Sequence, residues 1–548
     1  MKIKLLLVVV LCLDGYAYSP SLWPRVRSPE TYDVIVLGGG PVGARAAQRA
    51  GELGKRALVA DGSSTSETSF GGPTGLFSKA LRDTAKRVSV EAYRSLGMDD
   101  ESIFTQIRNE CRRLATTNAE AMRRECVSTG VEIVGGPAEL VDRGVDKTVR
   151  VRVGDTEYKG RNVLIATGST AFRPKDVPFD GVRIFDSDSI NGISFLPRSI
   201  AISGSGIVAV EYAKIFRKLG SSVTMVIRGD SPKQALQKAG IDSDIVSVLV
   251  SDLSRSGVTF ERSSVCAGFE CPPRTSSRKR QPLKIRVERN DGGHHQILKV
   301  DAFLAAIGRR PNAPKGIERV GVKADTYGNV VVDGDLRAAG NVFAAGDVLG
   351  RPFLASTGVA QGLQAIDVMF DTREASGAAS NVGANFDPES LEANPFAFPV
   401  GIWSSPEVAW FGYTKLQAEQ RGIRVVEGMA LYKEVLRGIV FSPDGLLKLI
   451  VDAPTGVVVG VHIVGSDACE IIHYGMELVR ARRTIADILE ATYSAVTFHE
   501  LYQVAARAAA DPAAARLRRR AAGAAWAAAD QERRTDALLW GSASAPSG

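Results

Sequence analysis

Cysteine is scarce in this chain of 548 residues, which contains only six. Cys12 lies in an N-terminal segment that we expect to be removed, and the remaining cysteines are an odd and widely spaced set. Such a set excludes a scaffold built on disulfide bonds. Long apolar runs are lacking too. The apolar run at residues 5–13 is too short to cross a bilayer, so we predict no stable membrane insertion.

A strong excess of one charge is also lacking. The 68 basic and 61 acidic residues leave a net charge of +7, and the basic residues lie in local runs instead of one stripe. We therefore predict no nucleic-acid partner. The sequence predicts no metal site either. The composition, 45% hydrophobic and 24% charged with 55 glycines, is typical of a globular chain of about three or four domains.

The N-terminus has the features of a targeting segment. Residues 1–4 supply positive charge, the apolar run follows, and residues 15–17 offer a cleavage site of small residues. The alternative, a first strand of the core, is disfavoured because residues 33–37 already fill that place. Residues 18–27 contain no acidic residue, as in a plastid transit region. We predict a signal in residues 1–30, with the secretory pathway and a plastid both open as destinations.

Two glycine-rich turns each follow an apolar strand and open a helix. The strands are expected at 33–37 and at 199–203. In this setting the glycines let the backbone approach a pyrophosphate, and the helix N-terminus presents free N–H groups to it. We predict that both turns bind dinucleotides, through Gly38, Gly39, Gly40, Pro41, Val42 and Gly43 in the first and Gly204, Gly206 and Ala209 in the second.

The residue at the end of the next strand distinguishes the two sites. Asp61 ends the strand after the first turn, where a carboxylate can accept hydrogen bonds from an unphosphorylated ribose such as that of FAD. At the matching place after the second turn stands Arg228, whose guanidinium can pair with a 2′-phosphate. We predict FAD in the first site and NAD(P)H in the second. The alternative is that Arg228 is simply a solvated strand end.

Further predicted strands end in glycines beside polar residues, as turns that face a nucleotide do. The carboxylate of Asp347 stands where the hydroxyls of a ribityl chain would need it. We predict that the cofactor sites are completed by Thr167, Gly168, Gly308, Gly346 and Asp347.

In this order, the motifs resemble a class I pyridine nucleotide-disulfide oxidoreductase from residue 32 to residue 506. The resemblance includes 308–312 (Gly-Arg-Arg-Pro-Asn) and 404–407 (Ser-Ser-Pro-Glu). It implies an α/β fold with two Rossmann-like domains for FAD and NAD(P), a C-terminal α+β dimerisation domain, and a homodimer. The expected parts are the FAD-binding domain 31–180 and 310–375, the NAD(P)-binding domain 181–309 and the dimerisation domain 390–510. Composition, not the resemblance, adds the targeting segment 1–30 and a low-complexity tail 511–548.

The redox cysteines of this family are missing. By resemblance they would stand nine and four residues before Lys79, where this chain has Phe70 and Gly75. The family's histidine and glutamate, which act from the partner subunit on the thiol's proton, correspond to Ala495 and Glu500. Since the cysteines and the histidine are lost together, disulfide chemistry is disfavoured.

Another cysteine pair, Cys266 and Cys271, falls in a stretch that we expect to be a surface insertion at 266–282. We interpret both as incidental surface thiols instead of a redox pair. His499, beside Glu500, lies off the family's spacing, and we interpret it as a surface or packing residue.

Within the family, local matches such as 78–82 (Ser-Lys-Ala-Leu-Arg) and 470–473 (Glu-Ile-Ile-His) resemble the soluble transhydrogenases. The resemblance implies that Lys79 and Glu211 form an ion pair near the flavin, where Lys79 stabilises negative charge. Glu500 is a third catalytic candidate. We expect hydride transfer from NADPH to NAD+ through FAD without a redox disulfide. Three alternatives stay open: a diaphorase or quinone-type reductase, a degenerate dihydrolipoamide dehydrogenase-like protein, and a non-catalytic flavoprotein-like scaffold.

Overall fold

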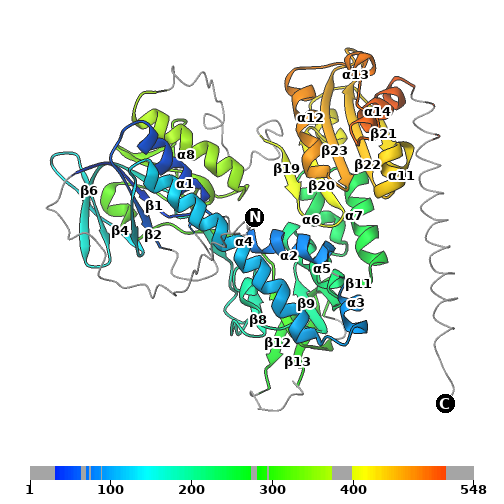
Figure 1. Ribbon diagram of the computed structural model, residues 1–548, viewed down its shortest axis with the longest axis horizontal. Helices are drawn as coiled ribbons and strands as arrows, with labels where there is room; N and C mark the ends of the chain where they lie inside the picture. The colour runs from blue at the N-terminus through cyan, green and yellow to red at the C-terminus, as the bar shows by residue number, and fades with distance from the viewer. Residues whose placement is uncertain are drawn as a thin grey trace, which may run out of the picture.

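The computed structural model shows three lobes (Figure 1). It describes residues 31–62, 70–72, 76–87, 89–272, 281–292, 295–372 and 398–511, together with 513 and 517. Outside the described residues lie the predicted targeting segment, Gly75, a Gly/Ser-rich linker at 376–388 and most of the tail. Among the described helices, none combines the length and the apolarity needed to cross a bilayer.

The first lobe is built on an eight-stranded sheet with β1 at its centre. β1 pairs in parallel with β2 and β6, and β4 and β5 extend the sheet in antiparallel fashion. The inner strands are apolar and buried on both faces, as a parallel sheet covered by helices requires. Its strands are β1 (Tyr32–Leu37), β2 (Ala57–Asp61), β3 (Glu132–Gly135), β4 (Ala138–Arg143), β5 (Val149–Val153), β6 (Thr156–Ile165), β17 (Arg337–Ala339) and β18 (Val342–Ala344).

Helices cover this sheet and connect it to the second lobe. Figure 1 shows α1 and α8 over the sheet, and α4 running from it toward the second lobe. α2 packs against α4 and also against α5 of the second lobe. The helices are α1 (Pro41–Glu52), α2 (Leu76–Arg87), α3 (Val90–Ser95), α4 (Asp100–Ser128) and α8 (Ala355–Met369).

The second lobe repeats the same architecture on a smaller scale. Its parallel sheet has the order β11-β10-β9-β15-β8, and a three-stranded antiparallel sheet lies beside it. Two short strands, β7 (Ser169–Ala171) and β16 (Arg309–Pro311), pair where the chain passes between the lobes. The elements of the second lobe are β8 (Ile184–Asp186), β9 (Ser199–Ser203), α5 (Ile207–Lys218), β10 (Ser222–Val226), α6 (Pro232–Lys238), α7 (Ser243–Arg255), β11 (Val258–Glu261), β12 (Ser264–Glu270), β13 (Leu283–Arg289), β14 (Gln296–Val300) and β15 (Ala302–Ala305).

The third lobe has a five-stranded antiparallel sheet of order β19-β20-β23-β22-β21. Helices α12 and α14 pack against this sheet. The predicted fold class, two Rossmann-like domains followed by an α+β domain, is confirmed. The elements are β19 (Val400–Ile402), β20 (Glu407–Gly412), α10 (Lys415–Gln420), β21 (Val425–Leu431), α11 (Leu436–Phe441), β22 (Leu446–Asp452), β23 (Val458–Gly465), α12 (Ala468–Arg480), α13 (Ile485–Glu490) and α14 (Glu500–Ala510).

The surface insertion expected at 266–282 is wrong for its first residues, and 273–280 lie outside the described residues. Cys266 lies within β12, which pairs with β13 as far as Glu270. The strand persists because Phe269 packs edge-on against Phe303, with 4.9 Å between ring centroids, and so anchors β12 to the parallel sheet.

Candidate dinucleotide cleft

One cleft of about 3330 Å³ runs past both glycine turns. Residues from all three lobes line it, including Asp61 and Lys79 from the first, Arg228 from the second, and Trp403 and Cys469 from the third. The carboxyl ends of both parallel sheets open onto this cleft, which is where ligands bind in doubly wound folds.

Two glycines of the first turn, Gly38 and Gly39, leave no room for a side chain. Gly38 has φ +113°, and a Cβ there would collide with the backbone of Ala166. A Cβ on Gly39 would meet the carboxylate of Asp61 at 2.6 Å. Gly40 is the N-cap of α1 and has no side chain to cap it, so the first N–H groups of the helix remain available to an anion. The structure places Asp61, only 9% exposed, directly beneath this turn.

A polar floor lies where a flavin would extend from that turn. Ser169 donates a hydrogen bond of 2.7 Å from its hydroxyl to Asp347, and burial raises the pKa of Asp347 above its ordinary value although Ser169 and Arg309 oppose the rise. The hydroxyls of Thr167 and Thr357 are buried with no hydrogen-bond partner among the described residues, and both residues line the cleft. Because buried hydroxyls are normally paired, these two fit a polar cofactor such as FAD.

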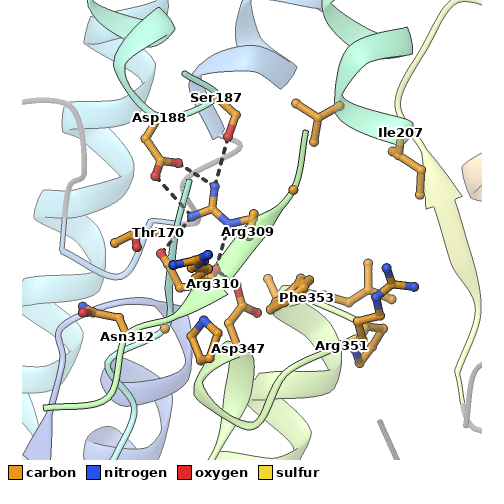
Figure 2. Close-up of a pocket in the computed structure, with 18 of the residues that line it drawn as sticks. Thr170, Ser187, Asp188, Ile207, Arg309, Arg310, Asn312, Asp347, Arg351 and Phe353 are labelled. Carbon is orange, nitrogen blue, oxygen red and sulfur yellow. Dashed lines mark hydrogen bonds and ion pairs between the residues drawn. The ribbon is translucent and has the colours of Figure 1, made fainter. Parts of the chain in front are cut away.

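Arg309 joins this floor to the second lobe. Its guanidinium donates to Asp188 at 2.6 Å, as Figure 2 shows. It also donates to the hydroxyl of Ser169 at 2.7 Å. Asp188 also accepts from the backbone N–H of Ala171 at 2.8 Å. Gly308, which precedes Arg309 with φ +126°, lets the chain turn between β15 and β16. The link between lobes is therefore a fully paired charge network.

The second glycine turn has the same form as the first. Gly204 has φ +126°, a Cβ there would collide with the backbone of Ala306, and Gly206 is the N-cap of α5. Arg228 is exposed, lines the cleft and makes no ion pair with any described residue. Ser231, Gln234 and Lys238, at the start of α6 and along it, also line the cleft. Two cations and a hydroxyl at one cleft wall favour a phosphate.

Lys79 and Glu211 form the predicted ion pair. The ammonium of Lys79, on α2, lies 3.0 and 3.3 Å from the two carboxylate oxygens of Glu211, on α5. Glu211 is only 4% exposed, and one of its oxygens also accepts from the backbone N–H of Trp403 at 2.9 Å. The pair lines the cleft between the two glycine turns, where it can stabilise negative charge.

Glu500, a predicted catalytic residue, and Phe70, at one of the family's cysteine positions, are not among the residues that line the cleft. Glu500, at the start of α14, accepts a hydrogen bond of 3.0 Å from the backbone N–H of Thr497 and does not line the cleft of its own chain. Phe70 is 4% exposed and packs in the core of the first lobe beneath Arg123, whose guanidinium lies 5.1 Å from the ring centroid. His499 packs beside the ring of Tyr474, as expected of a packing residue.

All five described cysteines are free thiols. Burial raises the pKa of Cys111 and of Cys126 to about 11 and that of Cys266 to about 12. Cys469 lines the cleft, but burial raises its pKa as well. These thiols stay protonated near neutral pH and are poor nucleophiles.

Sequence reasoning missed Ser169, Asp188 and Trp403. Trp403 directly precedes the 404–407 run that marked the third domain, and Ser169 directly follows the predicted Thr167-Gly168 turn. Extending the 404–407 motif by one residue toward the N-terminus would have included Trp403. Extending the Thr167-Gly168 turn by one residue toward the C-terminus would have included Ser169. Asp188 stands in no motif, so no local signal indicated it.

The fold and cleft define a two-dinucleotide oxidoreductase, and the comparisons with known proteins agree. Residues 32–362 match the pyridine nucleotide-disulphide oxidoreductase family and residues 398–506 match its dimerisation domain. The chain belongs to this family, whose members use FAD and NAD(P)H, and it is an oxidoreductase that carries the family's dimerisation domain.

Several relatives share one name. The chain is 29% identical to the soluble pyridine nucleotide transhydrogenases of Stutzerimonas stutzeri, over 87% of this chain and 97% of the relative, and of Pseudomonas aeruginosa, with the same coverage. Among solved structures, LpdA from Mycobacterium tuberculosis is similar at 23% identity with a TM-score of 0.71, covering 86% of this chain and 98% of that one. The flavoprotein disulfide reductase RclA from Escherichia coli is similar at 21% identity and the same TM-score, covering 87% and 99%. These structures support the fold.

Proposed function

We propose that the protein is a flavin-dependent NAD(P) transhydrogenase that passes hydride from NADPH to NAD+ without a redox disulfide. The observation that carries the proposal is the Lys79–Glu211 pair, set in one cleft with both glycine turns. Phe70, at one of the family's cysteine positions, is packed into the core. The names of the relatives support the same reaction.

FAD, when bound, supplies the electron chemistry by exchanging hydride with a nicotinamide ring. The chain's own residues bind, orient and balance charge. The first glycine turn and Asp61 suit a diphosphate with an unphosphorylated ribose, and the hydroxyls of Thr167 and Thr357 suit a polar ring system. Glu211 holds the ammonium of Lys79 in the lining of the cleft, where the ammonium favours negative charge on a bound neighbour.

The second glycine turn would serve both nicotinamide nucleotides in succession. Only this turn remains once the first holds FAD, so the oxidised product must leave before the acceptor enters, which gives ping-pong kinetics. Arg228 and Lys238 favour the 2′-phosphate of NADPH without excluding NAD+.

The direct test is hydride transfer from NADPH to thionicotinamide-NAD+ by the purified, yellow protein. We expect parallel lines in double-reciprocal plots, and activity that persists in a Cys266→Ser/Cys271→Ser control. A protein that oxidises NADPH with dye acceptors but never reduces the analogue would refute the proposal.

A second candidate, a quinone-type reductase, is favoured by the wall that the third lobe presents to the cleft. Phe398 and Trp403 line it, and such aromatic faces can stack on a flat acceptor. Quinone reduction much faster than transhydrogenation in the same preparation would favour this candidate.

A further inference from the structure

Three domains meet at one buried carboxylate. Glu211 lies on α5 of the NAD(P)-binding lobe, its ion-pair partner Lys79 lies on α2, and the N–H that completes the site belongs to Trp403 in the third lobe. The Glu211 oxygen bound by Trp403 at 2.9 Å is the one that Lys79 reaches only at 3.3 Å. The backbone N–H of Trp403 therefore orients the Glu211 carboxylate, and the carboxylate in turn positions the Lys79 ammonium.

Arg82 holds Trp403 in turn. It stands three residues after Lys79 on α2, so both side chains project from neighbouring positions of one helix. Its guanidinium lies 4.8 Å from the Trp403 ring centroid, and its Nη1 lies 3.5 Å from Glu407. The side chain is 7% exposed, and Nη1 makes no hydrogen bond within the described chain. Asp83 holds the other side of the guanidinium, with its Oδ1 2.7 Å from Nε and 2.6 Å from Nη2, so the group is fixed where it contacts the Trp403 ring.

Glu407 ties this arrangement to the body of the third lobe. It is 6% exposed and accepts a hydrogen bond of 3.3 Å from the backbone N–H of Cys469, the second residue of α12. Lys86, one turn beyond Arg82, also reaches Glu407, at 3.4 Å, but has no contact with Trp403. Arg82 alone connects the helix that carries Lys79 with the ring of Trp403, among the contacts found in the described residues.

We propose that Arg82 and Trp403 are positioning residues for flavin reduction, through which docking of the third domain sets the Lys79–Glu211 pair. Arg82 stacks on the Trp403 ring, the Trp403 N–H orients Glu211, and Glu211 places the Lys79 ammonium. This inference rests on one step of the proposed function, the reduction of the flavin by a nicotinamide nucleotide. It does not depend on the later transfer of hydride to NAD+. A misplacement of about 1 Å at such a site costs up to about a hundredfold in rate.

The test is anaerobic stopped-flow reduction of the flavin-loaded protein by NADPH. We expect Arg82→Gln to lower the limiting rate about tenfold, with little change in the NADPH concentration at half-saturation, because the nucleotide's binding groups are untouched. Arg82→Lys keeps the charge but not the planar stack, and should be nearly as slow. Trp403→Phe keeps a flat ring and the N–H, and should stay within about threefold of wild type. Lys86→Gln is the matched control and should react as wild type does.

A double-mutant cycle separates positioning from general damage. In a Glu211→Gln background, Arg82→Gln should slow reduction no further, because Arg82 acts through Glu211. Additive effects would overturn the proposal, and so would a wild-type rate in Arg82→Gln. If Arg82→Gln fails to fold, Arg82→Lys and Trp403→Ala carry the test at matched flavin content. Normal flavin reduction with no transfer to NAD+ would overturn the proposed function alone, whereas a flavin that neither NADPH nor NADH reduces would overturn both.

Discussion

At the second glycine turn, Arg228 stands at the cleft wall where a carboxylate would repel a 2′-phosphate. We predict that Arg228→Glu raises the KM for NADPH by about tenfold or more, the effect of losing a charge-assisted hydrogen bond, while the KM for NADH changes much less. Steady-state kinetics with both nucleotides measures this. Arg262→Glu makes the same charge change outside the cleft and should leave the ratio of the two KM values unaltered. An unaltered ratio in Arg228→Glu would contradict the role of Arg228 in binding the 2′-phosphate.

The thiols give a second prediction for single residues. Burial holds the pKa of Cys111, Cys126 and Cys266 at about 11 to 12, so these groups remain protonated at pH 7. We expect treatment of the native protein with N-ethylmaleimide to leave hydride transfer within about twofold of the untreated rate. Rapid inactivation that follows labelling of Cys266 or Cys271 would restore a redox role for that pair.

Local chemistry made part of the site predictable. The glycine turns and Asp61 follow from a strand, a turn and a helix that are continuous in sequence, and the structure brings them together. Trp403 and Glu211 are 192 residues apart, and Ser169 and Asp347 are 178 apart, so their contacts depend on how the domains dock. No periodicity within one segment can reveal such pairs. The strand that continues through residues 266–270 was missed for the same reason, since it depends on the distant Phe303.

Among the elements, the contact between α7 and the sheet of the third lobe is unusual because it buries charge. Lys448 on β22, 1% exposed, lies 2.9 Å from Asp242, 2.7 Å from Asp244 and 2.7 Å from Glu427. His462 on the neighbouring strand is fully buried beside them. A buried cation with three carboxylate partners makes this docking specific, and removing it would leave those carboxylates uncompensated.

We therefore predict that Lys448→Met lowers the free energy of unfolding by about 3–5 kcal/mol in urea titrations. Lys415→Met is the control, because Lys415 also contacts Glu427 but is 43% exposed, and it should cost less than about 1 kcal/mol. Equal decreases in the free energy of unfolding of the two variants would show that burial of the cluster does not increase its contribution to stability.

The same cluster predicts a pH dependence. Burial alone would raise the pKa of Asp242, but His462 and Lys448 hold it below its ordinary value. A depressed carboxyl pKa stabilises the fold above the unfolded value of about 4 and loses that contribution as the pH falls through the folded value. The free energy of unfolding of the wild type should thus fall on acidification, and that of Lys448→Met should fall less. Parallel plots of this free energy against pH for the two proteins would contradict the prediction.

At the scale of the whole molecule, the third lobe presents apolar side chains to solvent. Leu436, Ile439, Val440 and Phe441 on α11 are 54–61% exposed, at the outer edge of the lobe (Figure 1). They lie within the stretch that matches the family's dimerisation domain, so we predict that a second copy of the chain covers them. Light scattering should give twice the mass of one chain, and Ile439→Asp/Phe441→Asp should weaken the dimer about a hundredfold. Leu96→Asp, on an exposed residue of the first lobe, should not.

We also propose that residues 1–30 direct the protein to the secretory pathway or to a plastid. Their charge, apolar run and small residues support this. Fusion of residues 1–30 to a fluorescent protein in a plastid-bearing cell tests it; diffuse cytosolic fluorescence would be inconsistent with the proposal.

The buried ring of Phe70 bears on whether a redox cysteine could be introduced at this position of the chain. Phe70 fills core space beneath Arg123, so replacing it with cysteine would exchange a large apolar body for a small one and open a void costing about 3 kcal/mol. A new thiol would still lack its mate at position 75. A cysteine placed at position 70 would therefore destabilise the protein without providing a redox pair, so the packing of Phe70 opposes thiol chemistry at this position.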